Sequence, residues 1–91
     1  MQLYQGELIM MDRQEVFKRL NEIFQDIFDD EELVVTDETC ADDVEDWDSL
    51  RHITLISAVE RAFGFKFAMK EVLEMENVGA MADIIAERAT K

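Results

Sequence analysis

Between Asp26 and Asp48 every charged residue of this 91-residue chain is acidic, and no Lys or Arg interrupts the stretch. The like charges repel one another, and the apolar residues among them follow no helical period. These apolar residues are Leu33, Val34, Val35, Ala41, Val44 and Trp47. We therefore predict a long loop that is pinned to a core at a few points, with helical regions on either side of it.

The region before the loop has the pattern of one amphipathic helix. Asp12 and Glu15 have the spacing of a capping box, and apolar residues then recur at helical intervals as Val16, Leu20, Ile23, Phe24, Ile27 and Phe28. We predict a helix from about Arg13 to Phe28. Residues 1–11 contain neither a basic leader nor a long apolar run, so we interpret them as a loose N-terminal extension without a signal peptide or a membrane span.

The region after the loop predicts three further helices. Asp48 is a good N-cap for a helix from about Ser49 to Phe63, and Gly64 provides its C-terminal stop. Its apolar residues recur as Leu50, Ile53, Ile56, Val59 and Phe63. An extended connector follows, with Phe65 and Phe67 turned inward.

A short third helix is predicted from about Met69 to Met75, and Asn77 caps a fourth with the apolar side Val78, Met81, Ile84 and Ile85. We interpret Met69, Met75 and Met81 as adaptable core residues. The chain contains no proline. The predicted fold is all-α: one four-helix bundle over residues 12–91, with a long first loop and a short third helix.

Charge and cysteine content narrow the function classes. The formal net charge of −13 repels nucleic acids and anionic membranes and attracts partners with Lys and Arg patches. A single cysteine, Cys40, allows no internal disulfide and no Cys-based zinc site, and we expect a cytoplasmic location. The acidic loop has no register that fits an EF-hand, so we expect no metal site.

The chemically informative segment is Asp48-Ser49-Leu50, because it places a serine hydroxyl at the start of a helix. Free N–H groups and the positive end of the helix dipole converge there, and both stabilise an anion such as a phosphoester. We expect Leu50 to turn into the core and to hold Ser49 outward. The segment therefore favours attachment of a phosphate to Ser49.

The stretch Trp47-Asp48-Ser49-Leu50, the helix to Phe63, Gly64 and the pair Phe65 and Phe67 together resemble the acyl carrier proteins. The resemblance extends from Asp12 to the C-terminus and includes the order of helices, Glu60 before the helix-ending turn and the entry Asn77-Val78-Gly79. A bare Asp-Ser-Leu triplet occurs by chance, but its setting here makes the match specific.

The resemblance implies that a phosphopantetheinyl transferase moves 4′-phosphopantetheine from coenzyme A onto Ser49, with Asp48 and Leu50 shaping the acceptor site. The arm would hold acyl groups as thioesters for enzymes of fatty-acid, polyketide or other specialised biosynthesis. The resemblance implies no catalytic residues in the chain itself. From helical periodicity we further expect an acyl chain to lie between helices lined by Leu55, Ile56, Val59 and Ile84.

The resemblance also implies acyl-loading and acyl-transfer partners with basic docking patches, and we expect the chain to be a monomer. Arg51 and His52 occupy the turn after the motif, and Glu60 is the only carboxylate in the second predicted helix. Docking is therefore expected to depend more on the loop acids Asp42, Asp43, Glu45 and Asp46.

Other readings of the same residues stay open. Ser49 could simply be a helix-start residue of an unmodified acidic helical adaptor that binds a basic partner surface. A serine hydrolase using Ser49 and His52 would also need an oxyanion hole and a water-excluding pocket, so a catalytic pair is not favoured. A surface histidine is more often solvated or paired with a carboxylate, here Asp48. Cys40 lies among acids that disfavour its thiolate, so we interpret it as a packing residue.

Overall fold

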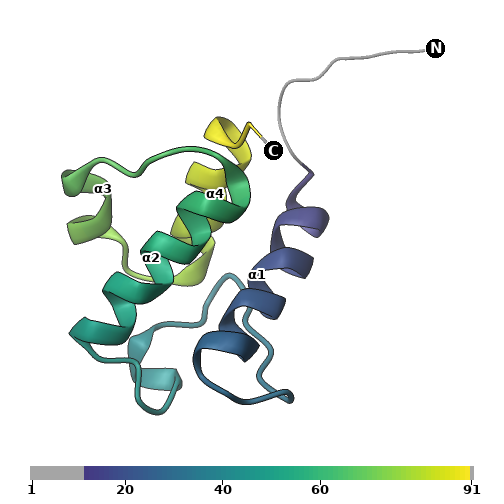
Figure 1. Cartoon of the computed structure of the whole chain (residues 1–91), viewed down its shortest axis with the longest axis vertical. Helices are drawn as coiled ribbons and strands as arrows, with labels where there is room; N and C mark the ends of the chain where they lie inside the picture. The colour runs from purple at the N-terminus through teal and green to yellow at the C-terminus, as the bar shows by residue number, and fades with distance from the viewer. Residues whose placement is uncertain (1–11, 91) are drawn as a thin grey trace.

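A computed structural model describes residues 12–90 as a bundle of four α-helices and one 3-10 turn, with no strand among them (Figure 1). The elements are α1 (Arg13–Ile27), η2 (Ala41–Asp43), α2 (Ser49–Phe63), α3 (Met69–Glu74) and α4 (Val78–Arg88). The expected N-terminal extension, residues 1–11, lies outside the described residues. The predicted all-α class and the order of two long helices, a short helix and a medium one are confirmed, and the 3-10 turn was not predicted.

Local capping explains why the helices begin and end where they do. Asp12 caps α1 by accepting the N–H of Gln14, at 3.1 Å, and not through the reciprocal capping box that its spacing to Glu15 suggested. Asn77 caps α4 by accepting the N–H of Ala80, at 2.8 Å. Gly64 ends α2 in the left-handed region at φ 71°, where the absence of a Cβ avoids strain.

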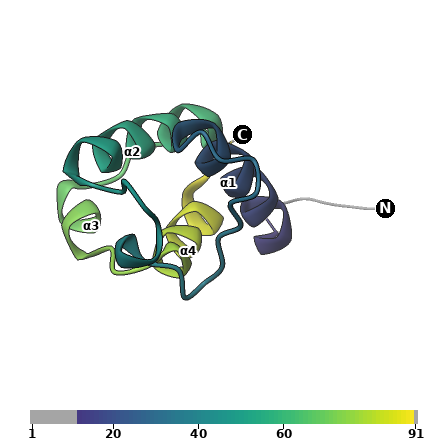
Figure 2. The same ribbon diagram turned by 90° about the horizontal axis from the view of Figure 1, so that it is seen from below.

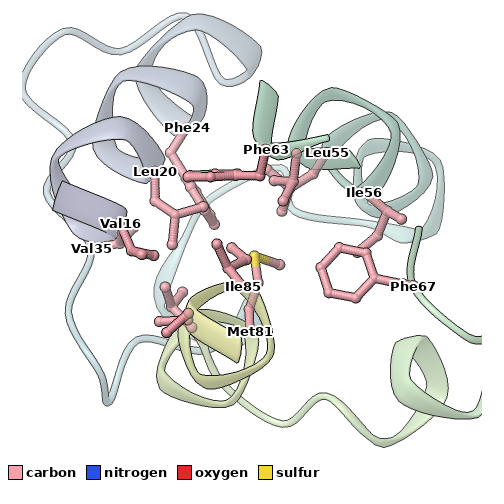
Figure 3. Close-up of a cluster of buried hydrophobic side chains, with 14 residues drawn as sticks. Val16, Leu20, Phe24, Val35, Leu55, Ile56, Phe63, Phe67, Met81 and Ile85 are labelled. Carbon is pink, nitrogen blue, oxygen red and sulfur yellow. The ribbon is translucent and has the colours of Figure 1, made fainter. Parts of the chain in front are cut away.

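The core lies between α1, α2 and α4, whose apolar stripes meet around Phe24 and Phe63 (Figure 3). Its fully buried members are Val16, Leu20, Phe24, Leu55, Val59, Phe63, Val78, Ala82 and Ile85. By contrast, α3 contributes no buried residue and lies beside α2 at the edge of the bundle (Figure 2). The side of the molecule between α2 and α3 is therefore less tightly filled than the centre.

The acidic loop is pinned to the core, as predicted, by Val35 and Val44, which are both buried. Val34 and Ala41 do not help, because both are exposed. Hydrogen bonds to polar side chains of α1 provide further attachment points for the loop. Asn21 on α1 accepts the N–H of Val35 at 2.7 Å, and Gln25 donates to the Leu33 carbonyl at 2.9 Å.

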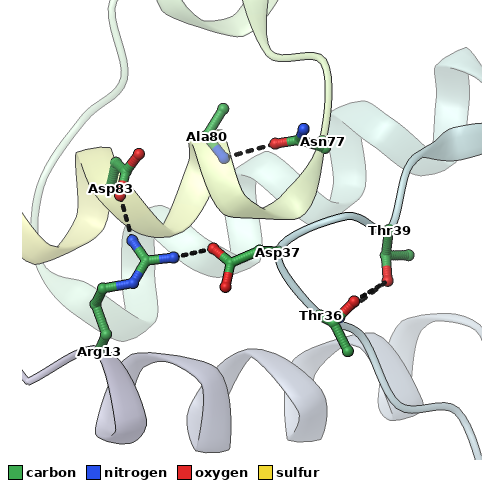
Figure 4. A network of polar contacts seen from close by, with 7 residues as sticks. All are labelled: Arg13, Thr36, Asp37, Thr39, Asn77, Ala80 and Asp83. Carbon is green, nitrogen blue, oxygen red and sulfur yellow. Dashed lines mark hydrogen bonds and ion pairs between the residues drawn. The ribbon is translucent and has the colours of Figure 1, made fainter.

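The second half of the loop is fastened to the start of α4. The N–H groups of Val78 and Gly79 donate to the carbonyls of Thr39 and Asp37, at 2.8 and 3.0 Å. Arg13 on α1 forms ion pairs with both Asp37 and Asp83, so that one guanidinium joins α1, the loop and α4 (Figure 4). The acidic loop is thus ordered by contacts with two helices, α1 and α4.

Helix α2 separates the residues that follow α4 from Ser49. At its C-terminal end, the backbone N–H of Thr90 donates to the Phe63 carbonyl at 2.8 Å, which ties the residues after α4 to the end of α2. At its N-terminal end α2 begins at Ser49. Among residues 12–90, we find no helix with the length and apolarity required to traverse a bilayer.

Candidate functional site

Ser49 is the first residue of α2, and it is exposed to solvent. The side chain of Asp48 accepts the N–H of Arg51 at 2.9 Å, and the Asp48 carbonyl accepts the N–H of His52 at 2.9 Å. The N–H groups of Ser49 and Leu50 have no acceptor within the helix, because the first turn lacks preceding carbonyls. The serine hydroxyl is therefore accessible and sits in the positive field of a helix N-terminus.

The expected inward position of Leu50 is wrong, because 72% of the surface of this residue is exposed. The error lies in the helical register. Successive steps of three residues each fall about 60° short of a full turn, so Leu50 lies about 180° from Val59 around the helix. The core face of α2 is instead formed by Leu55, Ile56, Val59 and Phe63. Leu50 therefore does not hold Ser49 outward; the outward position of Ser49 follows from the register of α2.

A pocket of about 910 Å³ opens between α2, α3 and the start of α4, and Ser49 is part of its lining. Its apolar lining consists of Ala41, Trp47, Ile53, Ile56, Phe67, Met69, Val72, Leu73, Met75 and Met81. Polar groups from Asp48, His52, Ser57, Glu60, Glu76 and Asn77 complete it. A hydroxyl at the edge of a largely apolar pocket fits an attached arm that carries an apolar cargo.

Of the four residues that periodicity assigned to an acyl-chain site, only Ile56 lines this pocket. Leu55 and Val59 are fully buried in the bundle core, and Ile84 packs against that core. The sequence reasoning missed Phe67, Val72 and Met75, although Phe67 was expected to face inward. Helical periodicity can assign residues of α2 to one face of that helix. The opposite wall of the pocket depends on where α3 packs, which periodicity does not give.

His52 joins the loop to α3 across one end of the pocket. Its Nδ1 accepts the indole N–H of Trp47 at 3.1 Å, and the ring also hydrogen-bonds to the backbone of Val72. Burial lowers the pKa of His52, and the bond to Val72 opposes this effect only partly. The expected pairing of His52 with Asp48 is not observed: Asp48 accepts backbone N–H groups instead. His52 thus supports the pocket wall.

Two charged residues of α2, Arg51 and Glu60, are occupied by structural contacts. Arg51 donates to the Ile27 carbonyl at the end of α1, at 2.7 Å, and its guanidinium lies 5.7 Å from the ring centroid of Phe28. Glu60 accepts the N–H of Phe67 at 2.8 Å and holds the connector against α2. The exposed start of α2 therefore presents little net charge beyond the loop acids that precede it.

The loop acids Asp42, Asp43, Glu45 and Asp46 are all exposed beside the start of α2. Asp43 has a structural task as well, because its carboxylate accepts the N–H and the thiol of Cys40 at 3.0 and 3.4 Å. Cys40 is half-buried, and it is not among the residues that pack against the core described above.

Comparison with known proteins agrees with this geometry. The family model described as "Phosphopantetheine attachment site" matches residues 18–85. An acyl carrier protein from Coprothermobacter proteolyticus is 32% identical over 75 residues, which cover 82% of this chain and 92% of that protein. The solution structure of a holo acyl carrier protein from Geobacter metallireducens superimposes with a TM-score of 0.72 and 42% identity, covering 76% of this chain and 79% of the other.

The bundle, the exposed helix-start serine and the matched family define a small carrier domain with a phosphopantetheine attachment site. The chain belongs to the acyl carrier protein family, and its cofactor is a covalently attached 4′-phosphopantetheine. Proteins of this family work with phosphopantetheinyl transferases and with enzymes that handle acyl groups.

Proposed function

We propose that Ser49 carries the 4′-phosphopantetheine arm and that residues 12–91 form the carrier domain. One observation supports this assignment above all: Ser49 combines an exposed hydroxyl, a helix N-terminus and the edge of an apolar pocket. The only other serine of the chain, Ser57, lies two turns further along α2, where every backbone N–H has a helical acceptor. A phosphoester at Ser57 would lack the favourable dipole and free donors.

In the loading reaction, a new bond forms between Ser49 Oγ and the β-phosphorus of coenzyme A. The bond from that phosphorus to the adenosine 3′,5′-bisphosphate oxygen breaks, and the hydroxyl proton is released. Asp48 holds the start of α2 so that the Ser49 hydroxyl faces solvent, and Leu50 presents an exposed apolar contact next to it. In our proposal, both residues shape the acceptor site for the transferase.

We assign no catalytic residue to the chain. The thiol of the arm would carry acyl groups as thioesters for enzymes of fatty-acid, polyketide or other specialised biosynthesis, whose basic docking patches meet the exposed loop acids. We propose that the carrier is a cytoplasmic monomer that binds neither nucleic acid nor membrane, which its net charge of −13 favours.

The test is the intact mass of the apo protein after incubation with coenzyme A, Mg²⁺ and a broad-specificity phosphopantetheinyl transferase. Wild type and Ser57→Ala should each gain one phosphopantetheine group, and Ser49→Ala should gain none. Ser57→Ala is the matched control, because it removes the same hydroxyl from an exposed position of the same helix. Loading of Ser49→Ala, or a failure of the helical wild type to load, would contradict the assignment and favour an unmodified acidic adaptor.

A further inference from the structure

Trp47 and His52 line the same pocket as Ser49, Trp47 from the turn before α2 and His52 from the first turn of that helix. The indole N–H of Trp47 donates to Nδ1 of His52 at 3.1 Å. The indole ring also contacts Phe24 of the core edge-on, with centroids 5.3 Å apart. The position of the Trp47 ring therefore depends on one hydrogen bond to α2 and on aromatic packing against α1.

The hydrogen bond to Trp47 determines the charge of His52. An indole N–H can only donate, so Nδ1 has to be an unprotonated acceptor and the ring has to be neutral, with its proton on Nε2. The ring also hydrogen-bonds to the backbone of Val72, whose own N–H donates to the Ala68 carbonyl at 3.1 Å. The partner of the Nε2–H group is therefore the Val72 carbonyl.

His52 thereby also supports α3. This helix has six residues, too few to be stable by itself, and it buries none of them. The Val72 carbonyl lies in its last turn and has no helical N–H to accept, because α3 ends at Glu74. His52 supplies the missing donor, so one ring connects α3 to the turn before Ser49.

Protonation of His52 affects its two contacts in opposite directions. Imidazolium donates from both nitrogens, so the bond to the Val72 carbonyl is kept and is strengthened by the charge. The bond to Trp47 is lost, because two N–H donors would then face each other across 3.1 Å. A positively charged His52 therefore stays on α3 and repels the indole, which makes Trp47 the side chain that moves.

The charged side chains around His52 leave the ring neutral. Three carboxylates line the same pocket: Asp48 before α2, Glu60 on α2 and Glu76 after α3. Within residues 12–90, none of them forms an ion pair with His52. Burial is the largest influence and lowers the pKa of His52 below its ordinary value of 6.5.

The remaining charged groups of the neighbouring elements are directed elsewhere. Arg51, the residue before His52, donates to the Ile27 carbonyl, and on the α1 side Trp47 contacts the uncharged rings of Phe24 and Phe28. The charged side chains of η2 and α3 lie outside the pocket lining: Asp42, Asp43, Lys70, Glu71 and Glu74.

We propose that Trp47 and His52 form a proton-sensitive gate beside Ser49, closed while His52 is neutral and open when Nδ1 takes up a proton from solvent. This role rests on the proposed attachment of the arm at Ser49, because an acyl chain on that arm enters the pocket next to the gate. The closed gate covers the chain with the Trp47 ring, and opening exposes the chain to water. The carrier therefore shelters its cargo less in mild acid than at neutral pH.

The first measurement uses the apo protein, in which His52 is the only histidine and Trp47 the only tryptophan. Proton NMR from about pH 8 to about pH 5 follows the imidazole signal, the indole N–H signal and the exchange of the indole N–H with solvent. Two variants are the controls. His52→Gln can accept from Trp47 but does not titrate, and Trp47→Phe keeps an aromatic ring but removes the N–H.

We expect the indole signal of wild type to shift with the same midpoint as the imidazole signal. Relative to His52→Gln at the same pH, exchange of the wild-type indole N–H should accelerate at least about fivefold toward pH 5, the factor that loss of one hydrogen bond gives to an opening equilibrium. The carboxylates are common to both proteins, so the ratio isolates His52.

The second measurement is the rate at which hydroxylamine cleaves the thioester of the octanoyl-loaded carrier. The ratio of the wild-type rate to the His52→Gln rate should rise at least about threefold between pH 8 and pH 5. Acetyl-loaded proteins, whose cargo is too short to reach far into the pocket, should show a constant ratio. Trp47→Phe should also show a constant ratio to His52→Gln, because protonated His52 then has no indole N–H to repel.

An indole signal that stays constant while His52 titrates would overturn the gate, as would a His52 that stays neutral down to pH 5. A rise in the cleavage ratio that persists in Trp47→Phe would overturn it too. A constant ratio for octanoyl-loaded wild type would show that Trp47 does not cover the cargo, with the same consequence. The proposed function fails in a different way, since the wild type would then not be loaded at all, whereas the apo titration would be unaffected.

Discussion

The indole N–H of Trp47 donates to Nδ1 of His52 over 3.1 Å, and the two ring planes are inclined at 28° with centroids 6.0 Å apart. Trp47 also contacts Phe24 edge-on, at a centroid distance of 5.3 Å, so the bond connects the core of α1 to α2. The second contact of His52, to the Val72 backbone, continues this connection to α3. One neutral imidazole therefore joins the segment before Ser49 to the far wall of the pocket.

This relationship predicts a loss of stability in mild acid. Burial lowers the pKa of His52 in the folded protein, so the unfolded chain takes up this proton at a higher pH. The stability that neutral His52 contributes is complete above its unfolded pKa of 6.5. It is lost as the pH falls through that value toward the lower folded pKa, because imidazolium can no longer accept from Trp47.

Urea unfolding from pH 8 to pH 5 measures the effect, with His52→Gln as the control. A glutamine oxygen can still accept from Trp47 but does not titrate in this range. The carboxylates are common to both proteins, so the difference between their unfolding free energies isolates His52. We expect the wild type to have the larger free energy of unfolding at pH 8, and we expect this difference from the variant to shrink toward pH 5. If the unfolding free energies of the two proteins changed with pH in parallel, the burial of a neutral His52 ring would be contradicted.

Gly79 is expected to tolerate no side chain. A Cβ at this position would lie 2.7 Å from the Asp37 carbonyl oxygen and 2.8 Å from its Oδ1. That carbonyl accepts the Gly79 N–H and cannot withdraw without breaking the link between loop and α4. Gly79→Ala should therefore lower the free energy of unfolding by about 1–3 kcal/mol.

Chemical denaturation of Gly79→Ala against Ser57→Ala measures this cost. Ser57→Ala changes an exposed helical position and should stay within about 0.5 kcal/mol of wild type. An equal stability of the two variants would mean that the loop shifts freely away from α4.

Arg51 is expected to stabilise the fold and not to contribute to docking. Its guanidinium caps the C-terminus of α1 through the Ile27 carbonyl and lies over Phe28. Arg51→Met should lower the free energy of unfolding by about 1–2 kcal/mol, because both contacts are lost. Arg61→Met, at an exposed position of the same helix, removes the same charge and should cost less. Thermal unfolding of both variants distinguishes a structural arginine from one that only alters net charge.

Asp48 offers a way to separate helix capping from recognition by the transferase. Its Oδ1 accepts the Arg51 N–H, and asparagine can do the same, so Asp48→Asn should keep wild-type stability. Asp48→Ala removes the acceptor and should cost about 1 kcal/mol. Denaturation midpoints test the cap, and loading rates of the Asn variant then report what the negative charge adds. A destabilised Asn variant would show that charge, not hydrogen bonding, holds the start of α2.

The ends of the helices could be predicted from the sequence because the capping residues that set them act locally. Asp48, Asn77 and Gly64 act within one turn of their own positions, and each lies at the expected helix end. The same locality misled the assignment of Leu50, since a run of apolar residues at intervals of three drifts around the helix. An apolar residue facing outward for contact with a partner cannot be told from a core residue by period alone.

The pocket could not be predicted because its wall depends on tertiary packing. Met69 was expected in the core but is 74% exposed, and it lines the pocket together with Phe67 and Met75. The position of α3 depends on contacts outside α3 itself, namely Glu60 with the Phe67 N–H and Arg88 with Glu71. The bond between Trp47 and His52 likewise requires the turn before α2, which no sequence period encodes.

The hydrogen bond from Thr90 to Phe63 has a practical consequence for how this carrier can be handled. It holds the residues after α4 at the far end of α2, about 21 Å along the helix axis from Ser49. A linker, affinity tag or surface anchor joined beyond Thr90 would therefore leave the molecule at the pole opposite Ser49, the proposed attachment site. Molecules immobilised in this way would keep Ser49 and the pocket open to any enzyme supplied in solution.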